Sequence, residues 1–195
     1  MRKGADTRGA VIDEALRQAV ELGLEGISLG GLAESLKLSK SGLFAHFRSK
    51  EALQLAVLDE ASDRFRRRVV EPALGEPRGE PRLRALFERW LDWIAGEPCM
   101  NGCVFAVASQ EYDDRPGPVR DRLVEVQNAW HELLARVATD LPKDGKAPVE
   151  FGRQVAFEFV GIGLSFQLHN KLMNRRDSRL RAEESLERLL RDSAG

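Results

Sequence analysis

Apolar residues recur along this chain every three or four positions, the spacing of an α-helix, and no segment alternates with the period of two that a strand requires. The first such segment runs from about Thr7 to Gly23. Thr7 is suited to cap the start of this helix, and Gly23 is suited to end it. The apolar residues that define it are Val11, Ile12, Ala15, Leu16, Ala19, Val20 and Leu24.

Three serines mark the starts of the next predicted helices. Ser28 precedes a short helix whose inward-facing residues are Leu29, Leu32, Ala33 and Leu36. Ser39 precedes a helix of two turns that carries Leu43, Phe44 and Phe47. Ser49 starts a longer helix that runs from Lys50 towards Val70 and is expected to end before Pro72, because proline cannot continue a helix.

Residues 72–82, PALGEPRGEPR, interrupt the helical pattern with three prolines and two glycines in eleven positions. This break predicts a head of residues 1–50, a connecting helix of residues 50–70, and a body of residues 71–195. The body contains four further helical stripes and one short apolar segment, at residues 83–94, 103–111, 118–137, 149–173 and 180–190. The predicted fold is all-α.

Composition and charge limit the class of protein. The chain has 195 residues, 43% of them apolar, and a net charge of -1, so it is globular and not a polycation, although one face can still be basic. No apolar run approaches the ~20 residues of a membrane span, and the charged N-terminus does not resemble a signal peptide. We expect a cytoplasmic protein.

The two short helices, Ser28–Leu36 and Lys40–Phe47, have the pattern of a helix-turn-helix. Ala33 is small enough for the second helix to cross the first, Leu38 fills the turn, and Leu43 is the buried residue of the second helix. Seven residues span ~10 Å, which fits a DNA major groove ~12 Å wide. The residues expected to project outward are Lys40, Ser41, Gly42, Ala45 and His46.

Residues 7–55 resemble the DNA-binding head of the TetR family of bacterial transcriptional regulators. The resemblance rests on fixed spacings of Ser28, Leu32, Ala33, Ser39, Lys40, Leu43, His46, Phe47 and Lys50. It implies a sequence-specific DNA-binding protein with a double-stranded operator as partner and a homodimeric assembly. The positions that correspond to the family's DNA contacts are Ser28, Lys40, Ser41, Gly42, Phe44, His46 and Lys50.

Three residues depart from the family's pattern. Phe44 replaces a tyrosine that would bind phosphate, and Gly42 often corresponds to threonine. Lys37 replaces a turn glycine, which costs ~1 kcal/mol if its backbone is left-handed. Each contact has a structural alternative: Lys40 and Lys50 as solvated charges, Phe44 as part of the core, and His46 as a helix cap.

The predicted helix of residues 149–173 has two apolar stripes on opposite faces. The first stripe is Phe151, Val155, Phe159, Ile162 and Phe166, and the second is Phe157, Val160, Gly161, Leu164 and Leu168. A helix that is apolar on both sides must be covered on both sides. We expect the second stripe to form the interface of a homodimer; the alternative is a central helix enclosed within one chain.

TetR-like proteins commonly bind a small-molecule effector in the body, so the resemblance implies a repressor released by such a ligand. Candidate pocket residues are Trp90, Trp93, Met100, Cys103, Phe105, Trp130, Phe166 and His169. They can equally be ordinary core residues. The alternative function is a TetR-like DNA-binding protein without a small-molecule effector, with a structural role or regulated by a protein.

The segment EPCMNGCVFAVASQE resembles one branch of TetR-like regulators in which a cysteine at a helix start senses oxidants or electrophiles. Cys103 holds that position here, with Cys99 nearby. The alternative, which we favour, is that Cys103 is a small buried apolar residue. Neither a catalytic constellation nor a metal-ligand spacing is present in the sequence, so we expect no enzyme, no metal and no cofactor.

Overall fold

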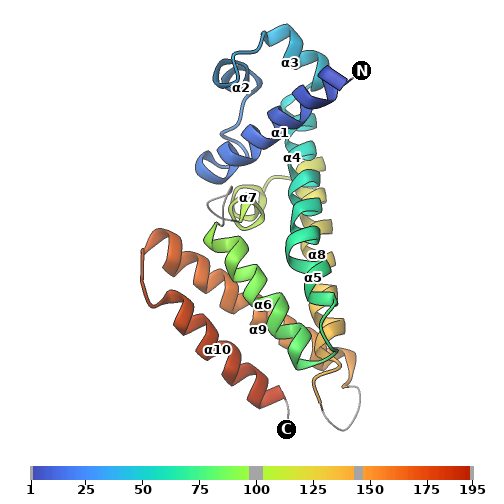
Figure 1. Cartoon of the computed structure of the whole chain (residues 1–195), viewed down its shortest axis with the longest axis vertical. Coiled ribbons are helices and arrows are strands. Elements are labelled where there is room, and N and C mark those ends of the chain that lie inside the picture. The colour runs from blue at the N-terminus through green and yellow to red at the C-terminus, as the bar shows by residue number, and fades with distance from the viewer. Residues whose placement is uncertain (1, 97–102, 143–146, 194–195) are drawn as a thin grey trace. The chain divides into compact units, whose positions relative to one another are not determined.

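The computed structural model describes residues 2–96, 103–142 and 147–193, and every regular element in these ranges is helical (Figure 1). The prediction of an all-α fold is confirmed. The chain forms two compact units, each made of two stretches of sequence. Residues 1–64 and 98–125 form the head unit, and residues 65–97 and 126–195 form the body unit. The predicted domains instead divided the chain once, near residue 70.

The head unit contains α1 (Arg2–Leu22), α2 (Leu29–Ser35), α3 (Lys40–His46), α4 (Lys50–Phe65) except its last residue, α7 (Val104–Tyr112) and the first part of α8 (Pro118–Ala138). The prediction that Thr7 caps α1 is wrong, because the helix starts five residues earlier. The segment before Thr7 contains no proline, and its first turns form without an apolar stripe. Gly23 ends α1 as expected, with φ of +82°.

The turn between α2 and α3 has the predicted serine caps. Ser28 Oγ accepts the N–H of Gly31 at 3.0 Å, and Ser39 Oγ accepts the N–H of Gly42 at 3.1 Å. Each cap satisfies one backbone donor that the helix leaves unpaired. Lys37 has φ of +54°, so the condition under which replacing the turn glycine costs stability is met here.

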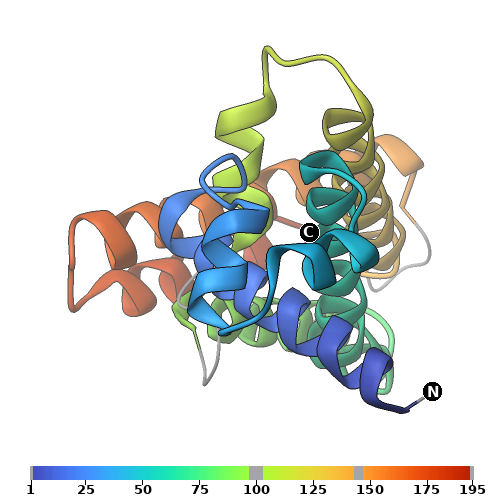
Figure 2. The same cartoon turned by 90° about the horizontal axis from the view of Figure 1, so that it is seen from above.

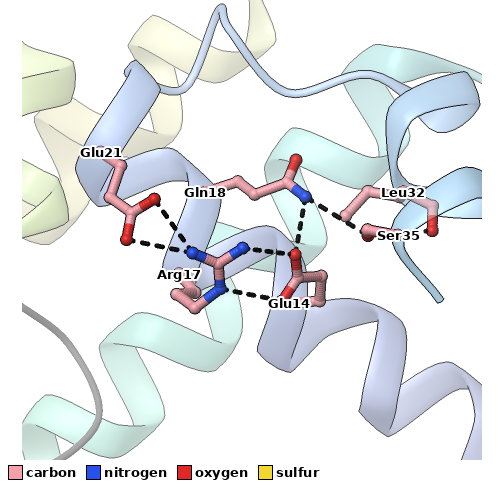
Figure 3. Close-up of polar contacts among 6 residues, drawn as sticks. All are labelled: Glu14, Arg17, Gln18, Glu21, Leu32 and Ser35. Atoms are coloured by element: carbon pink, nitrogen blue, oxygen red, sulfur yellow. Dashed lines mark hydrogen bonds and ion pairs between the residues drawn. The ribbon is translucent and has the colours of Figure 1, made fainter.

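A polar cluster holds α2 against α1 (Figure 3). Gln18 on α1 donates to Glu14 at 2.7 Å and to Ser35 on α2 at 3.4 Å. Arg17 lies between Glu14 and Glu21 and donates to both carboxylates. The hydrogen bond from Arg17 lowers the pKa of Glu14 to about 2, so this carboxylate stays charged in mild acid.

The body unit begins inside a long helical segment. The π-helical turn η1 (Arg66–Val70) and α5 (Glu71–Leu74) continue the helix beyond the predicted end. Pro72 lies two residues after the end of η1, where the Glu71 N–H donates to the Arg66 carbonyl five residues back, so the proline is accommodated next to a π-helical turn. The helix therefore ends near Gly75 and not before Pro72.

The remaining body helices are α6 (Glu80–Ala95), the rest of α8, α9 (Val149–Gln167), the π-helical turn η2 (Leu168–Leu172) and α10 (Ser178–Ser193). α9 and α10 lie side by side (Figure 1, orange and red). Close packing of α6 on α9 depends on Gly163, because a Cβ there would lie 2.1 Å from the Trp90 ring.

The two stripes of α9 have different environments. Val155, Phe159 and Phe166 of the first stripe are buried, whereas Phe157 of the second is 71% exposed. Leu164 and Leu168 of the second stripe are each 48% exposed. The body unit thus covers one stripe and leaves the other in contact with solvent.

Replacing Lys37 with glycine is expected to stabilise the protein by about 1 kcal/mol, because glycine adopts a left-handed backbone without the Cβ clash. Urea unfolding measures this change. Lys37→Ala is the matched control: alanine removes the charge but keeps the Cβ, so it should give no comparable gain. Equal stabilisation by both variants would contradict the backbone explanation.

Glu14→Gln is expected to lower the free energy of unfolding at pH 7, because it removes a carboxylate that the folded state stabilises. The pKa of Glu14 falls from 4.5 to about 2 on folding, so its contribution is present above pH 4.5 and is lost as pH falls towards 2. Urea unfolding at several pH values should show the difference from the unsubstituted protein shrinking over that range. Glu34→Gln, at an exposed position of α2, should show a smaller difference throughout.

Candidate nucleic-acid interface and ligand site

The first turn of α3, among the helices drawn in blue in Figure 2, contains Lys40, Ser41 and Gly42, which we predicted to contact DNA. Lys40, Ser41 and Gly42 are exposed, while Leu43 is completely buried behind them. The Ser41 hydroxyl donates to Ser39 Oγ at 3.3 Å, so it lies beside the cap at the start of the helix. The helix therefore has one face anchored in the head unit and one polar face that is accessible.

Phe44 and His46 differ in their exposure. Phe44 is 52% exposed, so it is not part of the small core formed around Leu43 and Phe47. His46 lies half-buried in the last turn of α3. Arg8 of α1 places its guanidinium 5.2 Å from the centre of the Phe47 ring, a cation–π contact that brings a positive charge close to α3.

Lys50 at the start of α4 is held by the turn between α1 and α2. Its Nζ donates to the backbone oxygen of Glu25 at 2.5 Å and to the Glu25 carboxylate at 2.9 Å. An ammonium group has three donors, so one remains for another acceptor such as a phosphate. Ser28 is exposed, but its hydroxyl oxygen already accepts the α2 cap bond.

The same turn is bound by the C-terminal end of α7. Glu111 accepts the backbone N–H of Leu24 at 2.7 Å and that of Glu25 at 3.3 Å. Tyr112 donates its hydroxyl to the Glu25 carboxylate, and this bond, with that from Lys50, lowers the pKa of Glu25 to about 2. Burial, with the Glu25 carboxylate, raises the pKa of Tyr112, so its hydroxyl remains a donor.

Sequence reasoning did not identify Glu25, Gln54, Glu111 or Tyr112. Gln54 on α4 completes the arrangement by donating to the backbone oxygen of Leu24 at 3.0 Å. We call Glu25, Lys50, Gln54, Glu111 and Tyr112 the turn network. The sequence gives only a weak indication of these contacts. The turn Gly23-Leu24-Glu25 leaves backbone N–H and C=O groups that need hydrogen-bond partners, but the residues that supply them lie far away in the sequence.

In the body unit, an aromatic cluster gathers rings from four segments of the chain. Phe65 packs edge-on against Trp93 of α6 and Trp130 of α8, with ring centres 5.4 and 5.0 Å apart. Trp90 stacks on Phe159 of α9 at 5.7 Å, with an angle of 6° between the rings. Further contacts join Trp90 to Trp130 at 5.6 Å and Phe87 to Phe159 at 5.2 Å.

The structure brings together only part of the predicted effector pocket. Trp90, Trp93 and Trp130 meet in the aromatic cluster. Phe166 and His169 instead line a groove of about 750 Å³ between α9 and α10, where His169 Nδ1 lies 2.8 Å from the Ser165 carbonyl oxygen.

The other predicted pocket residues belong to different parts of the chain. Cys103 and Phe105 are buried at the start of α7, in the head unit. Burial of Cys103 agrees with its interpretation as a small apolar core residue. Met100 and Cys99 lie outside the described residues.

None of the helices among residues 2–96, 103–142 and 147–193 combines the length and apolar character needed to cross a membrane.

Two families match the chain. Residues 11–57 match the bacterial regulatory proteins of the tetR family, and residues 79–186 match the tetracyclin repressor-like C-terminal domain. Among curated relatives, the HTH-type transcriptional repressor NemR of Escherichia coli is 24% identical over 119 residues. That match spans 60% of this chain and 60% of NemR.

Solved structures share the fold over nearly the whole chain. A TetR-family transcriptional regulator from Streptomyces coelicolor superposes with a TM-score of 0.82 at 22% identity, over 99% of this chain and 97% of its own. AibR, solved in complex with isovaleryl coenzyme A and operator DNA, gives a TM-score of 0.74 at 21% identity, over 91% and 94% of the two chains.

The C-terminal match alone spans more than half of the sequence, and the N-terminal match coincides with the helix-turn-helix described above. The chain therefore belongs to the TetR family of bacterial regulatory proteins.

Proposed function

We propose that this protein is a homodimeric repressor that binds a specific operator through α3 and leaves it when a small molecule binds the body unit. The observation that carries the DNA-binding part is the accessible first turn of α3, where Lys40 and Ser41 are exposed in front of the buried Leu43. An arginine or lysine can read guanine in the major groove, and a serine hydroxyl can bind either a base or a phosphate.

Two relatives support repression and a ligand. NemR is described as a repressor, and AibR has been solved with both an acyl coenzyme A and operator DNA. The aromatic cluster around Phe65 is our proposed effector site in this chain. It lies in the region that matches the tetracyclin repressor-like C-terminal domain, apart from Phe65 itself.

The second stripe of α9 supports a homodimer. One helix of two turns reads few base pairs, whereas a twofold dimer reads two half-sites about 34–36 Å apart. Phe157, Leu164 and Leu168 present an apolar surface that one chain leaves uncovered. Covering this surface with a second copy removes it from water and provides the second head.

We also propose that the turn network regulates the affinity of the protein for DNA. Lys50 offers one remaining donor to a phosphate, and Glu25 fixes where that donor lies. Tyr112 and Glu111 bind the same turn from α7. A shift of α7 would therefore move both the turn and Lys50, and so weaken a phosphate contact without altering α3.

Binding to duplex DNA is expected to weaken steeply with salt, with a log–log slope of about 0.9 per phosphate neutralised. Lys50→Ala should weaken binding to all sequences alike and reduce this slope by about one phosphate. Fluorescence anisotropy with fragments selected from the host genome measures both quantities. Arg89→Ala, at an exposed position of α6 in the body unit, is the control and should leave the slope unchanged.

Lys40→Ala should instead relax the preference at one base position by about 1–3 kcal/mol, because a base contact distinguishes sequences and a phosphate contact does not. Competition between operator variants with single base changes measures this loss. Our assignment of the base contact is wrong if Lys40→Ala weakens every variant equally.

Leu164→Glu should convert a dimer into monomers at micromolar concentration, because a charged side chain in a closely packed apolar interface loses its hydration. Light scattering measures the mass, and anisotropy should show weaker operator binding. Leu22→Glu alters a comparably exposed leucine on α1 and should leave the dimer intact. A monomer before any substitution would refute the dimer outright.

A further inference from the structure

Phe44 is an exposed aromatic side chain on the helix that we propose to contact DNA. Its side chain is 52% exposed. Of the other large apolar side chains described in the head unit, only Leu22 on α1 and Val124 on α8 are also exposed. Phe44 is thus the one aromatic side chain in this group. A partner that covers the ring gains the free energy of removing its apolar surface from water.

Phe44 shares one side of α3 with Lys40. The two residues are four positions apart, so their side chains are neighbours on the helix surface. Among the described residues, Phe44 has no ring or cation contact that holds it against the head unit, and the guanidinium of Arg8 lies over Phe47. The ring is therefore available to whatever Lys40 contacts on the same side of the helix.

The residues next to Phe44 do not screen its ring. Ala45 follows it and Gly42 lies two positions before it, and both are exposed and carry a methyl group or no side chain. Leu43 and Phe47 are buried instead, and they fix α3 to the head unit. No long side chain at positions 42 or 45 holds a base pair away from the ring.

The chemistry of the ring restricts what it can recognise. A phenyl group has no N–H or O–H donor, so it cannot bind a phosphate as a tyrosine hydroxyl does, and it cannot form hydrogen bonds to the polar edge of a base. The apolar group that base edges present in the major groove is the 5-methyl group of thymine, and phenylalanine is one of the residues that contact it. Thymine is therefore the base that this ring is suited to distinguish.

From these observations we propose that Phe44 reads the 5-methyl group of a thymine in the operator. The proposal names the base that the α3 site distinguishes and rests on the proposed binding of DNA through α3. Four residues of an α-helix span about 6 Å, and successive base pairs are about 3.4 Å apart. A helix that lies along the groove places this thymine about two base pairs from the base that Lys40 contacts.

Replacement of thymine by deoxyuridine tests the methyl contact directly, because it removes the 5-methyl group and keeps the base pair. The probe is a duplex operator fragment selected from the host genome, with each thymine replaced in turn in one half-site. Fluorescence anisotropy of the full-length protein should identify one thymine whose replacement weakens binding about fourfold, the loss expected when one methyl group is no longer buried.

Phe44→Ala should weaken binding to the thymine operator and bind the deoxyuridine operator equally well, because the ring that contacts the methyl group is gone. Phe44→Leu keeps an apolar side chain and should retain most of the preference for thymine. Leu22→Ala is the matched control: it removes an exposed apolar side chain of the same unit outside α3, so the fourfold preference should remain. Circular dichroism of each variant establishes that it folds.

Two results would overturn the proposal. The first is an operator in which no replacement of thymine weakens binding. The second is a preference for thymine that Phe44→Ala leaves unchanged, which would assign the effect to Ala45 or to the shape of the DNA. A protein that binds its operator but shows either result refutes the reading of thymine alone, whereas a protein that binds no genomic fragment refutes the proposed regulator as well.

Discussion

The position of the turn between α1 and α2 depends on two backbone N–H groups that neither helix satisfies. Leu24 and Glu25 lie between α1 and α2, and their amides donate to the carboxylate of Glu111, which is 87 residues from Leu24 in sequence. Without such an acceptor, the desolvation of these amides would cost on the order of 1–3 kcal/mol each. The polar contacts of Lys50, Gln54 and Tyr112 all converge on the same short segment.

This convergence explains why the head unit includes α7. A three-helix head has a small core, here centred on buried residues such as Leu16, Leu32 and Leu43. The short helices α2 and α3 have only seven residues each, too few to be stable alone. Packing on α1 and polar contacts from α4 and α7 therefore carry much of their stability, and a regulator can use such contacts to change how the head meets DNA.

In the body unit, the packing of large aromatic side chains sets the arrangement of the helices. Six aromatic side chains meet in one cluster, and their size leaves little freedom in how the helices approach. Gly163 lets α9 pass directly over the Trp90 ring, and the π-helical turns lie next to Phe65 and Gln167.

The sequence by itself determined the all-α fold, the serine caps at Ser28 and Ser39 and the two-sided character of α9, because local periodicity and capping chemistry produce these features. It misjudged the start of α1, where no strong signal marks the boundary, and the end of the helix near Pro72, where the helix continues through the proline by way of the π-helical turn η1. Only the tertiary structure decided that Phe44 is exposed and that Lys50 is bound to Glu25. It also decided that Trp90, Trp93 and Trp130 meet, whereas Phe166 lines the groove between α9 and α10. These outcomes depend on contacts between residues distant in the sequence, which the spacing within one helix does not contain.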